Sequence, residues 1–341
     1  MSTSTIADIA ARAGVGTATV DRVLNKRPGV NADTVQRVLQ VMAEIGAPPQ
    51  RGRPRRDSNF RFAFVLPGDQ TPFVDLVERQ IAQSASDFRH QHITEVTYLL
   101  DASDGSRFAE GLSQLADCDG VALLAPDLPP VKLAINGLVR SGIHVVTLFS
   151  DVAGSMRAAH VGADNRAAGR TAGLLLARMA APGRDTLLLA SQATRLSAEI
   201  ERRIGFAQVI EERFPKLQML RVPDLPADPA AAGRARTRVL KKGVDPARVA
   251  GLYNVGAGSA ALARALEAAG LAGVAPMAAH DLTDTHRTLL SSGGFAYLLT
   301  QDIHYCVGAA ARVLRALCEN VRGALSVVQP RVEILTAENL H

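Results

Sequence analysis

Chemically useful side chains in the long C-terminal part of this 341-residue chain lie directly after apolar, strand-like segments. Carboxylates and amides in such places can bridge pairs of hydroxyl groups, and an aromatic ring can pack on the C–H face of a sugar. The residues in these positions are Asp69, Thr71, Phe73, Ser150, Asp151, Asn254, Asp281 and Gln301. Their types predict a binding site for a small polyhydroxylated molecule.

A glycine-rich turn offers a second chemistry. Gly256-x-Gly258-x-x-Ala261 follows a strand-like segment and opens a helix-like one, and Asp281 ends the next strand. This pattern approximates a dinucleotide fingerprint, in which a pyrophosphate lies at a helix N-terminus. An NAD-dependent sugar or polyol enzyme is therefore the alternative interpretation, although glycine-rich strand-to-helix turns are ordinary in α/β proteins.

Four side chains of metal-binding type, His280, Asp281, Asp284 and His286, occur within seven residues. Their short spacing fits a turn followed by a helix N-terminus, with Thr283 or Asp284 as the N-cap, better than a metal site. No arrangement of nucleophile and base stands out in the sequence. We therefore predict a protein that is not an enzyme and that has no metal and no cofactor.

The excess positive charge is confined to the first sixth of the chain. Residues 1–56 contain nine Lys or Arg and four Asp or Glu, whereas residues 57–341 contain equal numbers of basic and acidic residues. This asymmetry predicts a basic head that binds a polyanion, attached to an electrically balanced body.

Cysteine usage and hydropathy restrict the compartment. The three cysteines, Cys118, Cys306 and Cys318, are widely spaced and fit neither a disulfide framework nor a zinc motif. The N-terminus lacks a secretory signal pattern, and no apolar run of about 18 residues is present. We expect a soluble, cytoplasmic protein.

Strand-like and helix-like patterns alternate through the body. The strand patterns lie at 62–66, 94–99, 120–124, 144–148, 186–190, 218–222, 249–253, 276–279 and 296–300. This alternation predicts parallel sheets with helices on both faces, and the length predicts two lobes. Ligands bind such folds in the crevice at the carboxyl ends of the strands, which is where the polar residues above lie.

The basic head has the pattern of three short helices. Thr5 is a plausible N-cap of the first, which Gly14 ends, and Thr17 is a plausible N-cap of the second. A third helix is expected from about Asn31 to Ile45. Two short helices joined by a glycine-containing turn and supported by a third form a helix-turn-helix.

The segment "TIADIAARAGVGTATVDRVLN" (5–25) resembles the DNA-binding head of the lactose-repressor and galactose-repressor family. The resemblance places Thr17, Ala18 and Arg22 on the recognition helix, with Arg22 as the candidate for a bidentate guanine contact. Positions that contact phosphate in the family are matched by Thr5, Asn25 and Thr34, with Asn31 as a further candidate. Gly16 and Asp21 stand where the family usually has serine, which alters the expected phosphate contacts.

The body resembles the periplasmic-binding-protein-like effector domain of the same family, with "HVGADNRAAGRTAG" (160–173) at the first crossover between lobes. The resemblance implies an N-lobe of residues 60–161 and 302–328 and a C-lobe of residues 162–301 and 329–341. It also matches Phe73, Asn254, Asp281 and Gln301 to ligand positions. Sugar-binding relatives often have an arginine on the helix before "GF". Ile200 occupies that position here, and Arg202 follows two residues later as the candidate.

The segment between head and body, residues 48–59, reads "PPQRGRPRRDSN". Relatives place a hinge helix here, but three prolines exclude one. Arg51-Gly52-Arg53-Pro54 instead matches the core of an AT-hook, an extended peptide that inserts arginines into a narrow A·T minor groove. A solvated basic linker that contacts phosphate is the alternative.

These observations predict an α/β protein with a helix-turn-helix head (1–47), a basic linker (48–59) and a two-lobed, doubly wound parallel-sheet effector domain (60–341) of the periplasmic-binding-protein type I class. The expected function is sequence-specific regulation of transcription, with repression as the expected mode. The expected partners are double-stranded operator DNA, a second copy of the chain in a dimer or tetramer, and a polyol, sugar or sugar-acid effector. The alternative is the NAD-dependent enzyme above, fused to a DNA-binding head.

Overall fold

The computed structural model describes residues 6–24, 29–44, 59–69, 71–115, 117–191, 195–222, 240, 243–321 and 327–340. Thr5, Asn25, Arg51 and Arg53, and with them the AT-hook-like segment, lie outside these residues. None of the described helices is both long and apolar enough to cross a membrane.

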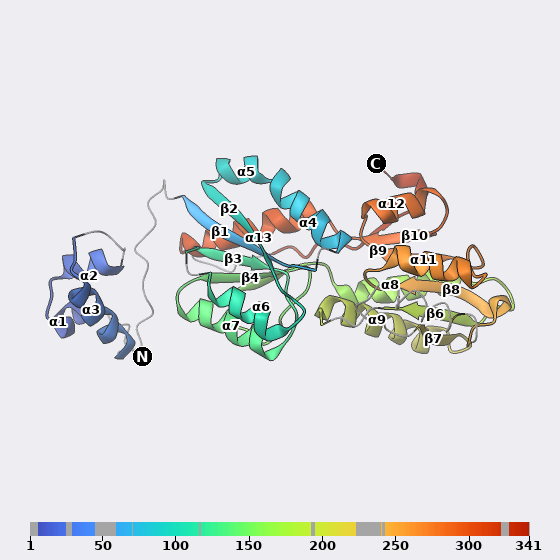
Figure 1. Cartoon of the computed structure of the whole chain (residues 1–341), viewed down its shortest axis with the longest axis horizontal. Helices are drawn as coiled ribbons and strands as arrows, with labels where there is room; N and C mark the ends of the chain where they lie inside the picture. Colours follow the sequence, from blue (N-terminus) through green and yellow to red (C-terminus); the bar gives the residue numbers. More distant parts are fainter. Residues whose placement is uncertain are drawn as a thin grey trace.

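Three helices form the head: α1 (Ile6–Ala13), α2 (Thr17–Leu24) and α3 (Ala32–Glu44) (Figure 1). Each contributes apolar residues at helical spacing to one small core, which includes Ile9, Val20 and Val38. Gly14 adopts a φ of +64°, which suits glycine, and ends α1. The backbone N–H groups of Thr19 and Val20 donate to the Gly16 carbonyl, so Gly16, rather than Thr17, precedes the first turn of α2.

The first lobe is built on a five-stranded parallel sheet in the order β2-β1-β3-β4-β5. The strands are β1 (Phe60–Pro67), β2 (Ile93–Leu100), β3 (Gly120–Leu123), β4 (His144–Leu148) and β5 (Ala159–Val161). The helices are α4 (Pro72–Gln83), α5 (Ala85–His90), α6 (Gly105–Ser113), α7 (Pro129–Arg140) and α13 (Ile303–Cys318).

Alternation along the strands divides the core of this lobe into two layers. Phe60, Phe62 and Phe64 on β1 share one apolar cluster with residues of α4, α5 and α13. Ala63 and Val65 point to the opposite face and pack with α6 and α7. Figure 1 shows α13, from the C-terminal part of the chain, beside the strands of this lobe.

The second lobe is built on a six-stranded sheet in the order β11-β10-β9-β8-β6-β7. The strands are β6 (Thr186–Ala190), β7 (Gln218–Val222), β8 (Val249–Asn254), β9 (Met277–His280), β10 (Tyr297–Thr300) and β11 (Glu333–Leu335). The helices are α8 (Asn165–Met179), α9 (Ser197–Arg213), α11 (Ser259–Ala268) and α12 (Asp284–Ser291), with short 3-10 turns η1 (Pro246–Arg248) and η2 (Ala337–Asn339). Two apolar layers again lie on opposite faces, with Leu187 and Leu189 in one and Leu188 in the other.

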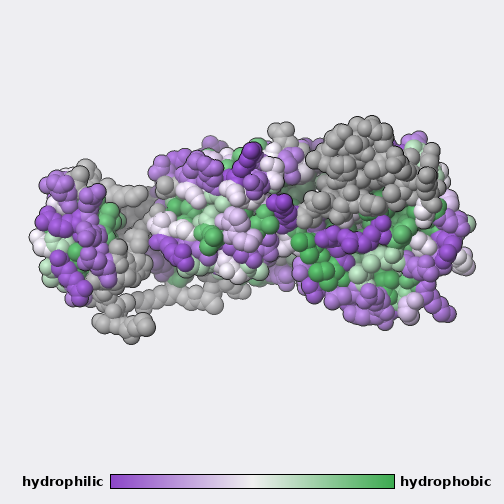
Figure 2. Space-filling model, turned by 60° about the horizontal axis from the view of Figure 1, so that its bottom comes forward, coloured by the Kyte–Doolittle hydropathy of each residue, from purple (hydrophilic) through white to green (hydrophobic). Residues whose placement is uncertain are grey.

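The predicted α/β class with parallel sheets is confirmed, and all nine predicted strands are present. Two further strands, β5 and β11, were not predicted because each has only three residues and lies at a sheet edge. One strand pair departs from the parallel arrangement, since the edge strand β11 pairs antiparallel with β10. Figure 2 shows hydrophilic side chains interspersed with apolar ones over the described surface on one side of the molecule.

Helices α8 and α9 cross in direct backbone contact. A Cβ atom at Gly169 would lie 1.9 Å from the Arg202 carbonyl oxygen, and one at Gly205 would lie 2.0 Å from the Arg166 carbonyl oxygen. Only glycine permits this approach, because any other residue would place a carbon inside the van der Waals radius of the facing backbone. The crossing fixes the position of the first two turns of α9, which carry Glu199 and Arg202.

Candidate effector site and DNA-binding surface

Residues at the carboxyl end of β4 in the first lobe contact the start of α9 in the second. The Ser150 hydroxyl lies 3.1 Å from the Ser197 hydroxyl and accepts from the Ala198 N–H at 3.2 Å. The Ser197 hydroxyl also donates to the Asp151 carbonyl at 2.6 Å. The two lobes therefore meet at the strand ends, where sequence reasoning placed the ligand.

A buried arginine organises the C-lobe side of this region. Arg202 is only 7% exposed, and its Nε donates to the Asn165 Oδ1 at 2.8 Å. Its Nη1 donates to the Val255 carbonyl at 3.4 Å and lies 3.7 Å from Asp281 Oδ2. Asn165 in turn donates to the Phe149 carbonyl of the first lobe at 3.0 Å. Arg202 thus links the crossover between lobes to a buried carboxylate.

Asp281 is held in an unusual backbone conformation. Its φ is +66°, in the left-handed region, and its N–H donates to the Leu299 carbonyl at 2.8 Å. Burial raises the pKa of the Asp281 carboxyl, while the charge of Arg202 acts in the opposite direction. Its Oδ1 is buried and has no hydrogen-bond partner among the described residues. Strained backbone at the end of a strand, with an unpaired acceptor, is characteristic of a binding site.

The amide of Asn254 is locked in one orientation. Its Nδ2 donates to the Gly256 carbonyl at 3.0 Å and to the Ser259 hydroxyl at 2.6 Å. That hydroxyl pairs with His286 Nε2 at 2.6 Å, and His286 Nδ1 lies 2.8 Å from the Asp281 carbonyl. Because a carbonyl only accepts, His286 Nδ1 donates to the Asp281 carbonyl. Asn254 Oδ1 is left as a buried acceptor with no partner in the described structure.

Sequence reasoning missed Glu199, which lies one turn before Arg202 on α9. The side chain as a whole is half-buried, but its Oε2 is enclosed and unpaired within the described part of the chain. Burial raises the pKa of Glu199 to about 7, with Arg202 and Arg203 opposing and Asp281 and Asp69 adding to the effect. Its i, i+3 spacing to Arg202 was the available signal in the sequence.

The N-lobe contributes an aromatic pair. Phe73 and Phe149 meet edge to face with ring centroids 5.4 Å apart. Phe149 directly follows β4 with a φ of +59°, and its N–H donates to the Val161 carbonyl at 2.9 Å. Phe149 and Asp281 therefore both have a left-handed backbone conformation at the end of a strand, one in each lobe. Phe149 was not among the predicted site residues.

Four predicted residues use their polar atoms in hydrogen bonds or ion pairs within the protein. Thr71 caps α4 by accepting from the Val74 N–H at 3.3 Å, and Ser150 bonds to α9 as described above. Gln301 Oε1 accepts from the Ala163 N–H at 2.8 Å. This bond joins the segment in which the chain passes from the first lobe to the second to the segment in which it returns. The Asp151 carboxylate accepts from Thr147 and from Arg157.

The structure therefore brings Arg202, Asn254 and Asp281 together in the second lobe, whereas Phe73 packs against Phe149 in the first. Asp69, which follows β1, is exposed, and its charge raises the pKa of Glu199.

The glycine-rich turn does not fit a dinucleotide. A Cβ atom at Gly256 would lie 2.5 Å from the carboxyl carbon of Glu199, so this carboxylate covers the turn. Gly258 precedes α11 with a φ of +84°. A pyrophosphate at this helix N-terminus would meet the acidic side chain of Glu199, which opposes the anion binding that a dinucleotide requires.

The histidine- and aspartate-containing turn has a structural role. Thr283 caps α12 by accepting from the His286 N–H. The sequence had predicted either Thr283 or Asp284 as this N-cap. His280 pairs with the Tyr253 hydroxyl, and burial lowers its pKa well below the usual value. Asp284 is exposed and pairs with Arg79 of the first lobe at 3.0 Å. Among the described residues, no group of three metal-binding side chains comes together.

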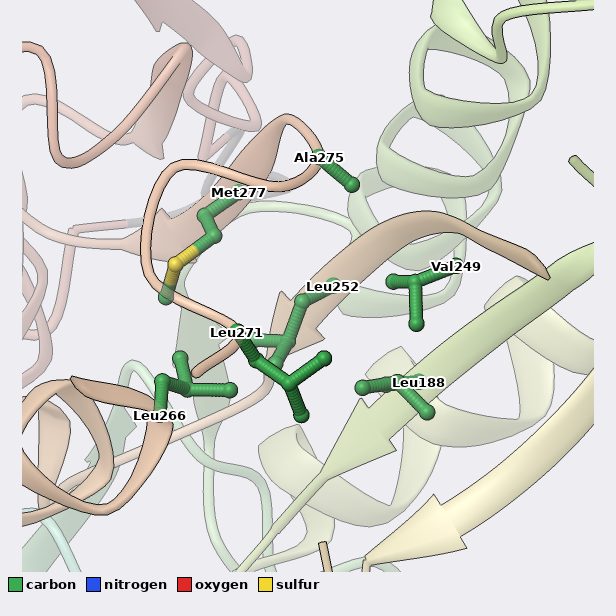
Figure 3. A pocket seen from close by; sticks show the side chains of 7 residues that line it. All are labelled: Leu188, Val249, Leu252, Leu266, Leu271, Ala275 and Met277. Carbon is green, nitrogen blue, oxygen red and sulfur yellow. The ribbon is translucent and has the colours of Figure 1, made fainter. Parts of the chain in front are cut away.

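A small cavity in the second lobe offers no alternative site. Its lining is entirely apolar and consists of Leu188, Val249, Leu252, Leu266, Leu271, Ala275 and Met277 (Figure 3). These side chains belong to the core layer between the sheet and α11. The cavity is a packing gap without the polar groups that would orient a sugar.

The head presents the predicted recognition residues on one helix. Thr17, Ala18 and Arg22 are exposed on α2, whereas Val20 and Val23 of the same helix are buried. Asn31 Oδ1 accepts from the Thr34 N–H at 2.8 Å and thereby caps α3. An exposed arginine on the second helix of a helix-turn-helix has the placement that major-groove reading requires.

Comparison with known proteins agrees with this architecture. Residues 62–321 match the periplasmic binding protein domain, and residues 5–50 match the bacterial regulatory proteins of the lacI family. The regulator reg1 of Streptomyces lividans, an HTH-type transcriptional regulator, is 42% identical over 82 residues, which is 24% of this chain and 24% of that protein. The chain thus spans about a quarter of the length of this curated relative.

Solved structures share the fold. A LacI-type transcriptional regulator from Bacteroides fragilis has a TM-score of 0.72 and 18% identity, covering 83% of this chain and 98% of that one. A solute-binding protein from Burkholderia graminis, in complex with D-arabinose, has a TM-score of 0.73 and 19% identity, covering 84% and 98%. The chain belongs to the periplasmic-binding-protein domain family and carries the helix-turn-helix head of the lacI family of bacterial regulatory proteins.

Proposed function

We propose that this protein is a sequence-specific transcriptional regulator whose affinity for operator DNA is set by a small sugar- or polyol-like effector bound between the two lobes. The observation that carries the proposal is the combination of two surfaces in one chain. The head exposes Arg22 on α2, and the interlobe region holds unpaired buried acceptors on Asn254 and Asp281. The D-arabinose held by the solute-binding neighbour supports a sugar-like ligand.

Effector binding would act through the contact between lobes. Ser150 and Ser197 join the lobes beside the site, and Arg79 and Asp284 join them through an exposed ion pair. A ligand held by both lobes stabilises the arrangement in which they are closed, and it shifts the population by its difference in affinity for the two states. In a homodimer or tetramer, that shift changes the spacing of the heads and therefore the affinity for a near-palindromic operator. Repression of target genes in the cytoplasm is the mode we propose.

A ligand screen on the full chain tests the proposal. A polyol, sugar or sugar acid present at about 100 times its Kd should stabilise the protein by about 2.7 kcal/mol and raise the Tm by several degrees. The same compound should change the affinity for DNA selected from a random pool, measured by fluorescence anisotropy. Asp281→Asn is the matched control, because asparagine tolerates the left-handed backbone but removes the carboxylate. A stabilising compound that leaves DNA affinity unchanged would contradict the coupling, and the absence of any stabilising compound would contradict the effector site.

The basic linker makes a separate prediction about operator sequence. If Arg51 and Arg53 insert into the minor groove between half-sites, replacing both with alanine should weaken binding more on operators with A·T-rich centres than on those with G·C-rich centres. Anisotropy titrations at fixed salt with the two kinds of centre measure the difference. Equal losses on both would leave only non-specific phosphate contact.

A further inference from the structure

We propose that the effector carries an amine group, as its ammonium ion, beside its hydroxyl groups, and that Glu199 and Asp281 receive this group. This inference rests on the proposed function, because it concerns the ligand of the same interlobe site. The class of ligand is a polyhydroxylated amine, such as an amino sugar or an amino polyol.

The unpaired polar atoms of the site all have the same hydrogen-bonding character. Glu199 Oε2, Asn254 Oδ1 and Asp281 Oδ1 are buried acceptors without a partner among the described residues. Asn254 is fully buried and Asp281 is 6% exposed, so solvent has little access to either. An ammonium group offers three donors and no acceptor, whereas a hydroxyl offers one donor and two acceptors.

The orientation of the acceptors is fixed by their neighbours. Asn254 directs its Nδ2 to Gly256 and Ser259, so its oxygen stays available as an acceptor. The Gly256 carbonyl can only accept, so the amide cannot turn its oxygen toward it without losing this hydrogen bond. A ligand that presents an acceptor to Asn254 would therefore face a second acceptor.

The charges around the site also favour a cation. Three carboxylates, Asp69, Glu199 and Asp281, lie in this region, and the charges of Asp69 and Asp281 raise the pKa of Glu199. The opposing positive charges are those of Arg202 and Arg203 on Glu199 and of Arg202 and His286 on Asp281. Arg202 is already committed to Asn165, Val255 and Asp281, and Arg203 is only half-buried. A sugar acid or sugar phosphate would add negative charge and further acceptors, which this surrounding opposes.

Matched pairs of compounds test the inference on the full chain. The pairs are a hexose with its 2-amino-2-deoxy analogue and a hexitol with its 1-amino-1-deoxy analogue, with the corresponding hexonate as the anionic member. Calorimetric titration should show the amine member of a pair binding roughly tenfold more tightly than its neutral partner, because a charge-assisted hydrogen bond replaces a neutral one. The hexonate should not bind.

The pH dependence gives a readout of Glu199 itself. The amino hexitol keeps its ammonium proton between pH 6 and pH 8, whereas Glu199, with a pKa of about 7, ionises over this range. Since the cation requires the ionised carboxylate, the affinity should rise roughly tenfold from pH 6 to pH 8. Glu199→Gln keeps the shape of the side chain and should remove both this rise and the preference for the amine. Glu201→Gln changes an exposed glutamate on the same helix, paired with Arg166, and should preserve both.

The outcomes separate this inference from the proposed function. A neutral sugar or polyol that binds as tightly as its amine analogue would overturn the inference and leave the effector site standing. An amine preference that persists in Glu199→Gln would also overturn it. Failure of every compound to bind would overturn both proposals.

Discussion

Gly205→Ala is expected to destabilise the second lobe by about 3 kcal/mol and to weaken effector binding. Its added methyl carbon would lie 2.0 Å from the Arg166 carbonyl oxygen and 3.1 Å from the Arg170 N–H nitrogen. Both atoms belong to the backbone of α8, so no side-chain rotation relieves the overlap and the helices must move apart. Because Arg202 lies one turn before Gly205, the displacement also moves the guanidinium away from Asp281.

Gly137→Ala provides the matched control for this prediction. Gly137 lies inside α7, and a Cβ atom there would have nothing within 4 Å. The same substitution in the same kind of element should therefore stabilise the protein, by about 0.5–1 kcal/mol, because alanine is the better helix former. Scanning calorimetry and circular dichroism suit the measurement, since the chain has no tryptophan. A Gly205→Ala protein as stable as wild type would show that α8 and α9 do not cross in backbone contact.

Arg22→Ala is expected to remove most of the discrimination between operator and random DNA. A bidentate arginine–guanine contact contributes about 1–3 kcal/mol of discrimination, and a dimer on a near-palindrome makes it twice. Arg22 is exposed on α2, on the same helix as the exposed Thr17 and Ala18, while the opposite face is buried in the head core. The loss should therefore appear as weaker binding to selected DNA, with little change in the folding of the head.

Arg12→Ala separates specific contact from general electrostatics. Arg12 is also exposed, but it lies in the last turn of α1 rather than on α2. Removing its charge should weaken binding to all sequences to a similar extent, and should leave the ratio between selected and random DNA almost unchanged. Competition titrations at fixed salt measure that ratio. An unchanged ratio in Arg22→Ala would contradict the assignment of α2 as the recognition helix.

The sequence predicted the region of the fold in which the polar side chains lie better than it predicted their hydrogen-bond partners. Short apolar segments between helix-like ones located the nine longer strands, and the residues after those strands located the region where the lobes meet. Asp151 and Gln301 show the limit. Both follow strands, as predicted, but their polar atoms are engaged by Arg157 and by the Ala163 N–H. Such partners come from tertiary contacts, in the second case 138 residues apart, which local patterns do not contain.

Glu199 was overlooked for a related reason. An acidic residue in the first turn of a helix is favourable anywhere, so its position alone gives no functional signal. Its significance comes from Gly256, a residue distant in the sequence whose missing side chain leaves room for the carboxylate. The crossing of α8 and α9 is likewise a property of paired glycines, Gly169 and Gly205, that neither helix reveals by itself.

The placement of α13 has a consequence for the order of events during synthesis. Residues of α13, among them Cys306, Val307 and Leu314, fill the same core layer as Phe62 and Phe64 of the first strand. The five strands of the first lobe are complete once β5 has emerged, but one face of their sheet is covered only by α4 and α5 until α13 has been made. The second lobe has its five parallel strands complete once β10 has emerged, with only the edge strand β11 still to come. Although domains usually fold from the N-terminus onward, the lobe that begins first can complete its core only after the parallel strands of the lobe that begins later have been made.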